Sequence, residues 1–319
     1  MTERRNSGAG TGELIFLEPV YLTTVWGGSR LRRMFGASVP DGTIGECLAI
    51  SARPGGDCRV SRGTFAGMTL SRLWAEHREL FGGAGAGSFP LQVKFLDARE
   101  DLSVQVHPDA SYAALHETDG GKNEAWLVLE PSETGRIVVG HHAATREQFA
   151  ALAGEGRWDE LLRSVEMKAD DFFLIPAGTV HAILAGSLVY EVQQASGVTY
   201  RLFDYGRLEG GAPRELHVGK ALDVVSAPSA PEASAPTVTS EGGAQRSLFT
   251  RNEHFTLSRW DVAERATIAL QSPFQLVSVL EGPGTVNGEP VEAGDQFVAP
   301  SSVVVLDVTG PVVLLVSGL

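Results

Sequence analysis

From Leu14 onward the sequence is divided into short apolar segments separated by turn residues, and this division favours a mainly β fold. The segments are rich in Val, Ile, Leu and Phe, while Gly, Pro and Asp recur between them. Short apolar runs bounded by turn signals are typical of antiparallel strands joined by tight connections. The clearest predicted strands are LQVKFLDA, LSVQVHP, EAWLVLE, GRIVVG, DFFLIPAG, HAILAGSLVYEVQQ and TYRLFDY.

Two segments have helical periodicity instead. Residues 69–82 begin with Thr69, a residue type that caps helices, place apolar side chains at helical intervals and end in two glycines. Residues 145–165 form a second helical region that is interrupted near Gly154 and Gly156. We therefore expect a small helical insertion within a β protein.

A stretch rich in Pro, Ala and Ser, residues 226–240, divides the chain. Such a composition offers little apolar surface to bury, so it predicts a linker or a surface crossover. We expect a flexible tail over residues 1–13, a metal-binding domain over 14–225 and a C-terminal β domain over 241–319.

Two segments share an order of residue types. VEMKADDFFLIPAGTVHAI and VLEGPGTVNGEPVEAGDQFVAPSS each contain an acidic, Gly-containing or polar turn, then an apolar strand, then Pro and small residues. We interpret them as possible copies of one barrel module. Only the first has a histidine, His181, after its Pro, so the C-terminal copy is predicted to lack a metal.

The overall charge limits the partners. The formal net charge is −13 over 319 residues, whereas binding to nucleic acid or to an anionic membrane requires a basic face. We expect neither partner, and a small anionic substrate would need a local group of Lys and Arg. The N-terminal residues lack an apolar core segment and no later run approaches a membrane span, so we predict a cytoplasmic protein. The oligomeric state is left open.

Gln105 and His107, in LSVQVHP, are two residues apart in a predicted strand. Their side chains therefore leave the same face, while Val104 and Val106 point to the other. An amide oxygen and an imidazole on one face can bind a divalent cation, although a hydrogen-bonded polar pair is an equal alternative for these two residues alone.

Two further candidates extend this pair. Glu124 begins the next strand in GKNEAWLVLE, and His181 follows a Pro-Gly turn in IPAGTVHAI. Two imidazoles, a carboxylate and an amide oxygen form a mixed nitrogen and oxygen set that suits zinc and leaves room for a substrate oxygen.

Several motifs make the sequence similar to a known family. PLQVKFLDAREDLSVQVHPD, GKNEAW, IPAGTVHAI and YEVQQASGVTYRLFDYGR occur in this order, preceded by WGGSRL and IGECLAIS. Together they resemble the type I mannose-6-phosphate isomerases, in particular the short bacterial form, from about Leu14 to Lys220 and more loosely beyond. The resemblance implies two cupin-type (jelly-roll) β barrels. It also implies one catalytic Zn²⁺ per chain, with the ligands Gln105, His107, Glu124 and His181.

The resemblance further implies catalytic residues. Arg201 matches the family's active-site arginine, and we assign it to stabilising an enediolate, because a guanidinium stays protonated and is a poor base. Lys94 and Lys122 match two lysines around the family's site. Partial burial near a dication lowers the pKa of a lysine, which would suit a base or a proton relay. The role of each lysine is open, as is the alternative of ordinary strand and turn lysines. Trp26 is a candidate for substrate binding, with core packing as the alternative.

Two positions depart from the family. An acidic residue commonly stands four positions before the active-site arginine, but Gly197 occupies that position here. Longer members of the family have a histidine directly before the lysine, where this chain has Gly121. These departures bear more on the exact substrate than on the metal.

The resemblance thus predicts a zinc-dependent aldose-ketose isomerase that interconverts mannose 6-phosphate and fructose 6-phosphate through an enediol. One alternative, motivated by Gly197, is an isomerase of a different phosphosugar. Another is a metal-binding cupin that binds a sugar phosphate without converting it.

Overall fold

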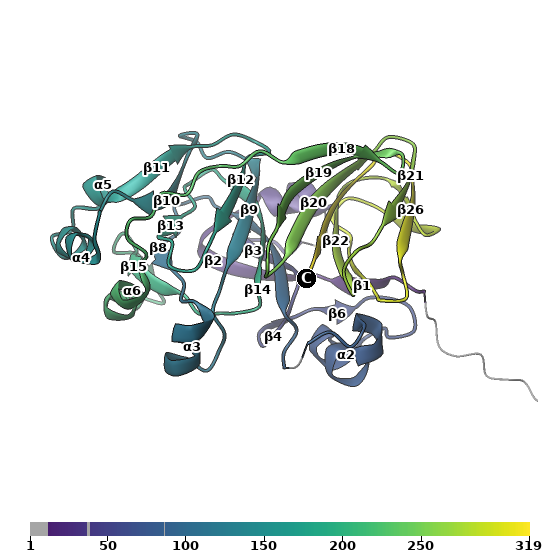
Figure 1. Ribbon diagram of the computed structural model, residues 1–319, viewed down its shortest axis with the longest axis horizontal. Helices are drawn as coiled ribbons and strands as arrows, with labels where there is room; N and C mark the ends of the chain where they lie inside the picture. Colours follow the sequence, from purple (N-terminus) through teal and green to yellow (C-terminus); the bar gives the residue numbers. More distant parts are fainter. Residues whose placement is uncertain (1–11, 37–38, 86) are drawn as a thin grey trace, which may run out of the picture. The chain divides into compact units, whose positions relative to one another are not determined.

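The computed structural model describes residues 12–36, 39–85 and 87–319, and these residues form a mainly β protein (Figure 1). The predicted fold class is confirmed. Of the predicted flexible tail, residues 1–11 lie outside the described residues. No helix in the described ranges is long and apolar enough to cross a bilayer.

The chain forms two compact units. One, here called the central unit, comprises Tyr21–Leu48 and Leu91–Pro236. The other, here called the terminal unit, comprises the described residues up to Val20 together with Ala49–Pro90 and Thr237–Leu319. The sequence predicted a continuous domain over 14–225, but the structure assigns two parts of that range to the terminal unit. The reason is backbone pairing, because β1 (Ile15–Glu18) lies between β25 (Gln296–Ala299) and β6 (Arg59–Val60) in one sheet.

The central unit contains two main sheets. The first has six strands, in the order β12 (Phe172–Ile175), β9 (Glu124–Glu130), β14 (Leu188–Gln194), β7 (Leu91–Asp97), β3 (Ile44–Ile50) and β2 (Val20–Gly28). The second has five strands, in the order β11 (Leu162–Glu166), β10 (Arg136–His141), β13 (His181–Ala182), β8 (Val104–Val106) and β15 (Tyr200–Phe203). A short hairpin, β16 (Leu208–Glu209) and β17 (Ala212–Pro213), follows β15.

Apolar side chains from both sheets of the central unit form one core. The six-stranded sheet contributes Trp126 and Phe173, and the five-stranded sheet contributes Ile137 and Val139. The other face of the five-stranded sheet buries Val104 and Val106 together with residues of three helices (Figure 1): α4 (Arg146–Gly154), α5 (Trp158–Leu161) and α6 (Val218–Val224). The opposite, inward face of β8 is therefore left for polar side chains. The central unit also contains α1 (Arg30–Phe35) and α3 (Ala110–His116).

Both predicted helical regions are present, but the second ends earlier than predicted. Residues 69–82 contain α2 (Leu70–Glu76) and the 3₁₀ helix η2 (Arg78–Phe81), and the Thr69 side chain accepts a hydrogen bond from the backbone of Arg72. The region 145–165 is broken into α4 and α5 as expected. Its last residues were predicted as helix, but they belong to β11, because pairing with β10 overrides the local helical pattern.

The terminal unit also contains two main sheets. The larger has the order β18 (Thr237–Glu241), β19 (Ala244–Arg251), β20 (Thr256–Val262), β27 (Val312–Gly318), β22 (Gln275–Glu281), β25, β1 and β6. The smaller has the order β21 (Arg265–Ala269), β26 (Val305–Thr309), β23 (Gly284–Val286) and β24 (Glu289–Val291). Trp260, Ile268, Leu306 and Val316 are among the residues of its apolar core. Two short strands, β4 (Ala52–Arg53) and β5 (Gly56–Asp57), pair with each other.

The two larger sheets share their strand pairing. Glu124 of β9 pairs with Ile175, the residue before Pro176, and Gln275 of β22 pairs with Ala299, the residue before Pro300. Each sheet also has a register shift toward the far end of that strand, before Glu130 in β9 and before Glu281 in β22. The shared register supports the interpretation of two copies of one module.

The predicted linker, residues 226–240, makes backbone contacts along the central unit. Ser229 forms a β-bridge with His141, Ser234 forms one with Phe172, and β18 begins at Thr237.

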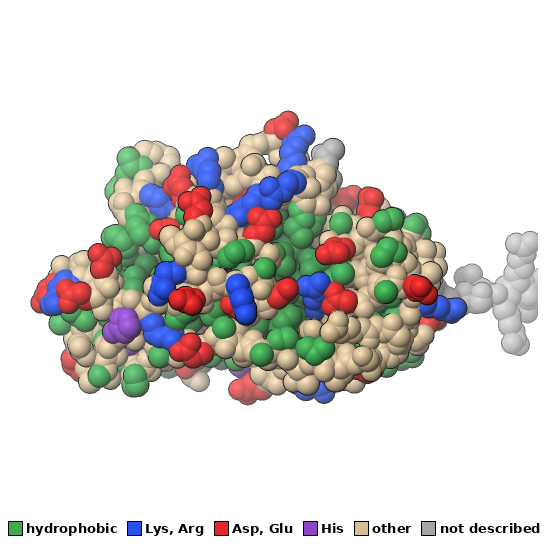
Figure 2. Space-filling model, turned by 90° about the horizontal axis from the view of Figure 1, so that it is seen from above, with side chains coloured by type: hydrophobic (Ala, Val, Ile, Leu, Met, Phe, Trp, Pro, Cys, Tyr) green, Lys and Arg blue, Asp and Glu red, His purple; other side chains and the backbone are tan. Residues whose placement is uncertain are grey.

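On the face drawn in Figure 2, acidic and basic side chains are interspersed.

Candidate metal centre

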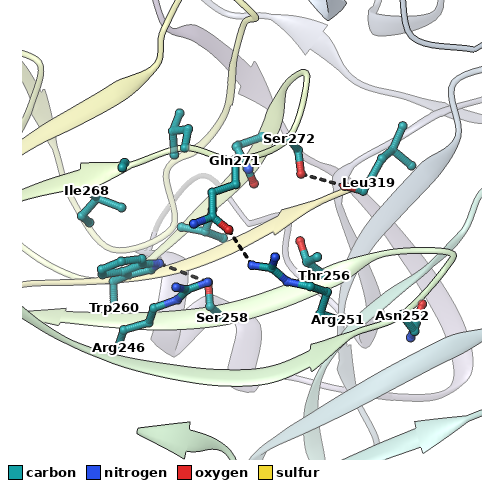
Figure 3. Close-up of a pocket in the computed structure, with 14 residues that line it drawn as sticks. Arg246, Arg251, Asn252, Thr256, Ser258, Trp260, Ile268, Gln271, Ser272 and Leu319 are labelled. Carbon is teal, nitrogen blue, oxygen red and sulfur yellow. Dashed lines mark hydrogen bonds between the residues drawn. The ribbon is translucent and has the colours of Figure 1, made fainter. Parts of the chain in front are cut away.

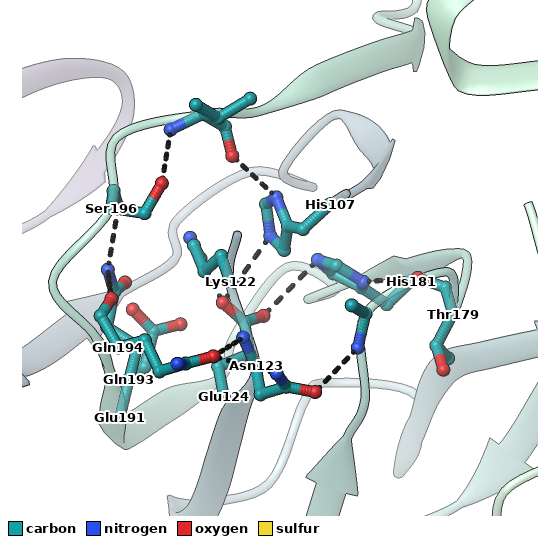
Figure 4. A network of polar contacts seen from close by, with 12 residues as sticks. His107, Lys122, Asn123, Glu124, Thr179, His181, Glu191, Gln193, Gln194 and Ser196 are labelled. Carbon is teal, nitrogen blue, oxygen red and sulfur yellow. Dashed lines mark hydrogen bonds and ion pairs between the residues drawn. The ribbon is translucent and has the colours of Figure 1, made fainter. Parts of the chain in front are cut away.

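Three buried side chains converge inside the central unit (Figure 4). His107 directly follows β8, Glu124 begins β9 and His181 begins β13, and their ligand atoms all lie within 4.8 Å of one another. His107 Nε2 is 3.4 Å from Glu124 Oε2, and His181 Nε2 is 3.3 Å from Glu124 Oε1. These residues are 0–1% exposed. The structure thus brings together three of the four predicted ligands.

The orientation of both imidazoles is fixed by backbone carbonyl groups. His107 Nδ1 lies 2.9 Å from the Val198 oxygen, and His181 Nδ1 lies 2.9 Å from the Thr179 oxygen. A carbonyl oxygen only accepts, so each Nδ1 carries the proton and each Nε2 directs its lone pair toward Glu124. Neither Nε2 atom has a hydrogen-bond partner, and the Glu124 carboxylate has no hydrogen bond beyond its ion pair with Lys122. Buried unpaired acceptors at this separation fit a divalent metal ion.

The protonation states of the cluster also suit a metal. Burial, reinforced by the charge of Lys122, lowers the pKa of His107 to about 3, and burial also lowers the pKa of His181. Burial alone would raise the pKa of Glu124, but the charge of Lys122 holds it well below its usual value. Neutral imidazoles and an ionised carboxylate are the forms that bind a metal.

Asn123 connects the two loops that present Glu124 and His181 (Figure 4). Its side-chain nitrogen donates to Gln194 Oε1 at 2.7 Å, and its side-chain oxygen accepts from the backbone N–H of Ala177 at 3.0 Å. Ala177 belongs to the turn before His181. Asn123 was not selected from the sequence, because its partners come from two distant segments.

Gln105 lies on the same row of the sheet as His181 and Arg201. It pairs with His181 on β13 and with Arg201 on β15, so the three side chains share the inward face. Val104 and Val106 point into the helix-covered core, as predicted from the alternation along β8. The role of Gln105 as a fourth ligand stays a prediction.

Lys122 lies beside the cluster. Its Nζ atom is 3.0 Å from Glu124 Oε2, and its backbone N–H donates to the Pro108 oxygen at 2.9 Å. The preceding residue, Gly121, passes close to the start of α3. A Cβ atom at position 121 would lie 2.3 Å from the Ala110 nitrogen, so the backbone path requires glycine there. This close approach explains why Gly121 stands where longer members of the family have a histidine.

Lys94 is held between two carboxylates. Its Nζ atom is 3.2 Å from Glu191 Oε1 and 3.7 Å from Glu46 Oε2, and Trp126 Nε1 donates to Glu191 Oε2 at 2.9 Å. Burial alone would lower the pKa of Lys94, but the carboxylates raise it above its ordinary value. Without a bound metal, the two carboxylates thus oppose the lowered pKa that was expected for Lys94, and that expectation did not include Glu191. The sequence does contain a sign of this partner. Glu191 is the charged residue of the apolar strand LVYEVQQ, and it lies two positions before Gln193, on the same face.

Arg201 lies at the edge of the inward face, next to further charged residues. Its Nη1 atom donates to the Glu215 oxygen at 2.8 Å, while its Nε atom is buried without a hydrogen-bond partner. Burial and the nearby Arg214 lower its pKa. Asp204 accepts hydrogen bonds from both Arg207 and Arg214, with Arg214 Nε at 2.7 Å. These arginines were not selected from the sequence.

The remaining predicted residue, Trp26, packs in the apolar core. It is 5% exposed and belongs to the same cluster as Trp126 and Leu96. The structure therefore supports the core-packing alternative, and a contact between Trp26 and a sugar stays a prediction.

A carboxylate from another segment lies next to Gly197. The backbone N–H of Gly197 donates to Asp119 Oδ2 at 2.9 Å. Asp119 precedes Gly120 in the loop between α3 and β9, far from Gly197 in sequence. An acidic group is thus present beside the position at which the family's acidic residue is absent.

Comparison with known proteins adds independent information. Residues 14–125 match the family model of the type I phosphomannose isomerase catalytic domain, and residues 245–319 match that of the mannose-6-phosphate isomerase cupin domain. The chain is 41% identical over 296 residues to mannose-6-phosphate isomerase ManA of Bacillus subtilis, covering 91% of this chain and 94% of that protein. It is 40% identical over 296 residues to mannose-6-phosphate isomerase of Streptococcus mutans, covering 91% and 93%.

The fold also matches a solved structure. The crystal structure of the mannose 6-phosphate isomerase from Bacillus subtilis superposes with a TM-score of 0.92 at 39% identity, covering 96% of this chain and 99% of that chain. The predicted cupin fold is confirmed by this match and by the cupin-domain match of residues 245–319.

Proposed function

The chain belongs to the type I phosphomannose isomerase family, and from this premise we propose that it interconverts mannose 6-phosphate and fructose 6-phosphate. The observation that carries the proposal is the buried group of His107, Glu124 and His181, in which both imidazole Nε2 atoms lack a hydrogen-bond partner. A buried polar atom without a partner raises the free energy of the folded state. A bound metal ion would give these atoms a partner and would assist the reaction.

The proposed metal is a single Zn²⁺ held by His107, Glu124 and His181, with Gln105 as the fourth ligand. A mixed set of imidazoles, a carboxylate and an amide oxygen supports this choice. When bound, the ion would supply a Lewis acid for the oxygens at C1 and C2 of the sugar. The hydrogen bonds that fix both Nδ1 atoms preorganise the two imidazoles for this role.

The proposed reaction moves a proton between C1 and C2 through an enediol, so negative charge develops on an oxygen. Arg201 is assigned to stabilise that charge. It shares the inward row with Gln105 and His181, and its buried Nε atom has a hydrogen still to donate. A guanidinium stays protonated, which excludes Arg201 as the base.

The two lysines receive different roles. Lys94 remains protonated between Glu191 and Glu46, so it contributes a fixed positive charge and does not act as the base. Lys122, next to Glu124, stays the lysine candidate for proton transfer.

The arginines near Arg201 support a phosphate subsite. Arg201, Arg207 and Arg214 place three guanidinium groups near two carboxylates, Asp204 and Glu209, which leaves one positive charge in excess. Guanidinium groups bind phosphate with paired, charge-assisted hydrogen bonds. An acidic chain needs such a local group to bind a phosphosugar.

Gly197 was the reason to consider a different phosphosugar. The contact between Asp119 and the Gly197 backbone favours mannose 6-phosphate instead, because it returns a carboxylate to that place. We assign to Asp119 the orienting role of the acidic residue that is missing at position 197.

The test is product formation by the purified protein from a panel of hexose and pentose phosphates, with coupled detection of each ketose phosphate. The proposal predicts the highest kcat/KM for mannose 6-phosphate. A clearly higher value for another aldose phosphate would replace the substrate, and no turnover of any would favour a cupin that only binds its ligand.

A further inference from the structure

A cavity of about 140 Å³ lies in the terminal unit, inside the barrel end formed by β19, β20, β21, β22 and β27 (Figure 3). This volume is about ten times the roughly 10–15 Å³ that a cavity needs to hold one water, so the cavity can admit a small ligand. Its floor is made of core residues, namely Trp260, Ile268 and Val316. Its walls are polar and include Thr256, Ser258, Asn252, Gln271, Ser272 and Gln275.

The cavity corresponds to the metal centre of the other unit. In the central unit, a row across the sheet runs from Ile175 through Glu124 and Gln193 to Gln92. The matching row in the terminal unit runs from Ala299 through Gln275 and Gly318 to Thr256. Gln275 thus occupies the position of the ligand Glu124. The same end of the barrel is hollow in the terminal unit but carries different side chains.

Two arginines reach this cavity because β19 contains a bulge. Arg246 pairs with Trp260, and Arg251 pairs with Thr256, on the neighbouring strand. The two arginines are five residues apart, so a regular strand would place them on opposite faces. The register shifts between Leu248 and Thr250, and this shift turns Arg251 to the side of Arg246.

Both guanidinium groups have hydrogen-bonding capacity left. Arg246 lies 5.1 Å from the Trp260 ring and pairs with Glu241 through Nη1, while its Nε atom is buried without a hydrogen-bond partner. Arg251 is exposed and donates through Nη2 to Gln271 Oε1 at 2.5 Å across the cavity (Figure 3). Arg246 is already paired with the Glu241 carboxylate, whereas Arg251 forms no ion pair with a carboxylate side chain among the described residues, so its charge is available to an anion in the cavity.

We propose that this cavity is a second ligand site, for a small hydroxylated anion of the size of a monosaccharide phosphate or sugar acid. Arg246 and Arg251 bind the phosphate or carboxylate, since planar guanidinium groups bind both with paired hydrogen bonds. Hydroxyl and amide side chains such as Ser258 and Gln271 bind the sugar hydroxyls. All lining residues belong to the terminal unit, so the site shares no side chain with the metal centre.

The readout is the indole N–H signal of Trp260 in ¹H–¹⁵N spectra of the full chain, assigned with Trp260→Phe. This N–H donates to Ser258 Oγ at 3.1 Å within the cavity, so a bound ligand changes its surroundings directly. The probes are glucose 6-phosphate, gluconate, inorganic phosphate and glucose. A saturable shift with glucose 6-phosphate or gluconate is expected, and whichever binds more tightly identifies the anionic group.

The variants separate this cavity from the metal centre. Arg251→Gln removes one charge at an exposed side chain and is expected to weaken binding about tenfold or more, as loss of a charge-assisted hydrogen bond does. Arg246→Gln is expected to act in the same direction. The control is Arg265→Gln, an exposed residue of β21 outside the cavity lining, which should leave the affinity unchanged. Basal isomerisation is measured separately with each variant, so failure of the proposed reaction would not alter this result.

The proposal is overturned if no probe gives a saturable Trp260 shift, or if Arg251→Gln and Arg265→Gln bind equally well. Equal affinity for inorganic phosphate and glucose 6-phosphate would also overturn it, because the sugar hydroxyls would then contribute nothing.

Discussion

The interiors of the two units differ in chemistry although their strands pair alike. In the central unit, Glu191 of β14 pairs with Trp126 and Lys94. At the corresponding positions of the terminal unit, Val316 pairs with Val277 and Ser258. The ladder and its bulge are the same, so the backbone alone does not specify a metal centre. What differs is which inward positions carry charged side chains (Figures 3 and 4).

Burying these charges is costly without partners. The central unit offsets this cost by pairing Lys94 with Glu191 and Lys122 with Glu124, while the His107 and His181 Nε2 atoms have no hydrogen-bond partner. The terminal unit fills most of its interior with apolar residues. The interior of the first unit is thus marked by paired charges, and that of the second by apolar packing, with polar side chains around the cavity.

The two units should differ most in how the loss of one inward side chain affects metal content and turnover. His181→Ala is expected to abolish both turnover and tight metal binding, because it leaves an incomplete ligand set. The matched change in the terminal unit is Gln275→Ala, at the position of Glu124, and it should leave metal content and turnover near those of the unmodified protein. Metal content by elemental analysis and coupled turnover assays measure both. Metal-independent activity of His181→Ala would break the assignment.

Arg201→Ala should leave the metal in place but reduce kcat by about a hundredfold or more, the effect of losing one group that stabilises a developing oxyanion. Arg265→Ala, on the outside of the terminal unit, provides the control for charge removal. Steady-state kinetics on metal-loaded protein gives the answer, and an unchanged kcat would remove Arg201 from the mechanism.

Lys94→Met should destabilise the fold by about 3 kcal/mol, since it leaves Glu191 buried without its cation. Adding Glu191→Gln should recover part of this loss. At the equivalent position of the terminal unit, Ser258→Ala should cost about 1 kcal/mol. Urea unfolding of metal-free protein measures each free energy, and equal losses at the two positions would contradict the contrast between the units.

The same lysine predicts a dependence on pH. The pKa of Lys94 is raised in the folded state, so its stabilisation is complete below the unfolded value of about 10.5 and is lost as pH rises above it. The difference in unfolding free energy between the unmodified protein and Lys94→Met should therefore shrink above that pH. A difference that stays constant through the alkaline range would argue against the paired lysine.

The smallest expected effect concerns Asp119. Asp119→Asn keeps an acceptor for the Gly197 N–H but removes the charge, and kcat should fall about tenfold. Gly197→Asp in the same chain should restore part of the rate, because it returns the carboxylate to the family's position. An unchanged rate in Asp119→Asn would make this contact structural only.

The sequence predicted the strands, and it selected the three residues that converge in the structure, His107, Glu124 and His181, because both rest on local patterns. Alternation along LSVQVHP placed Gln105 and His107 on one face, and the order of the family motifs added Glu124 and His181. What it missed depends on pairing between distant segments. β1 joins a sheet formed nearly 300 residues later, and Glu191 and Asp119 reach Lys94 and Gly197 only through the tertiary fold. The cavity was missed because a bulge in β19 reverses the side of Arg251.

The most direct test of the account is the relation between metal content and turnover. Chelator-stripped protein is titrated with Zn²⁺ while bound metal and fructose 6-phosphate formation are measured together. The account predicts no turnover without metal and a linear rise that saturates at one Zn²⁺ per chain. Full turnover of metal-free protein, or saturation that is independent of His107 and His181, would contradict it.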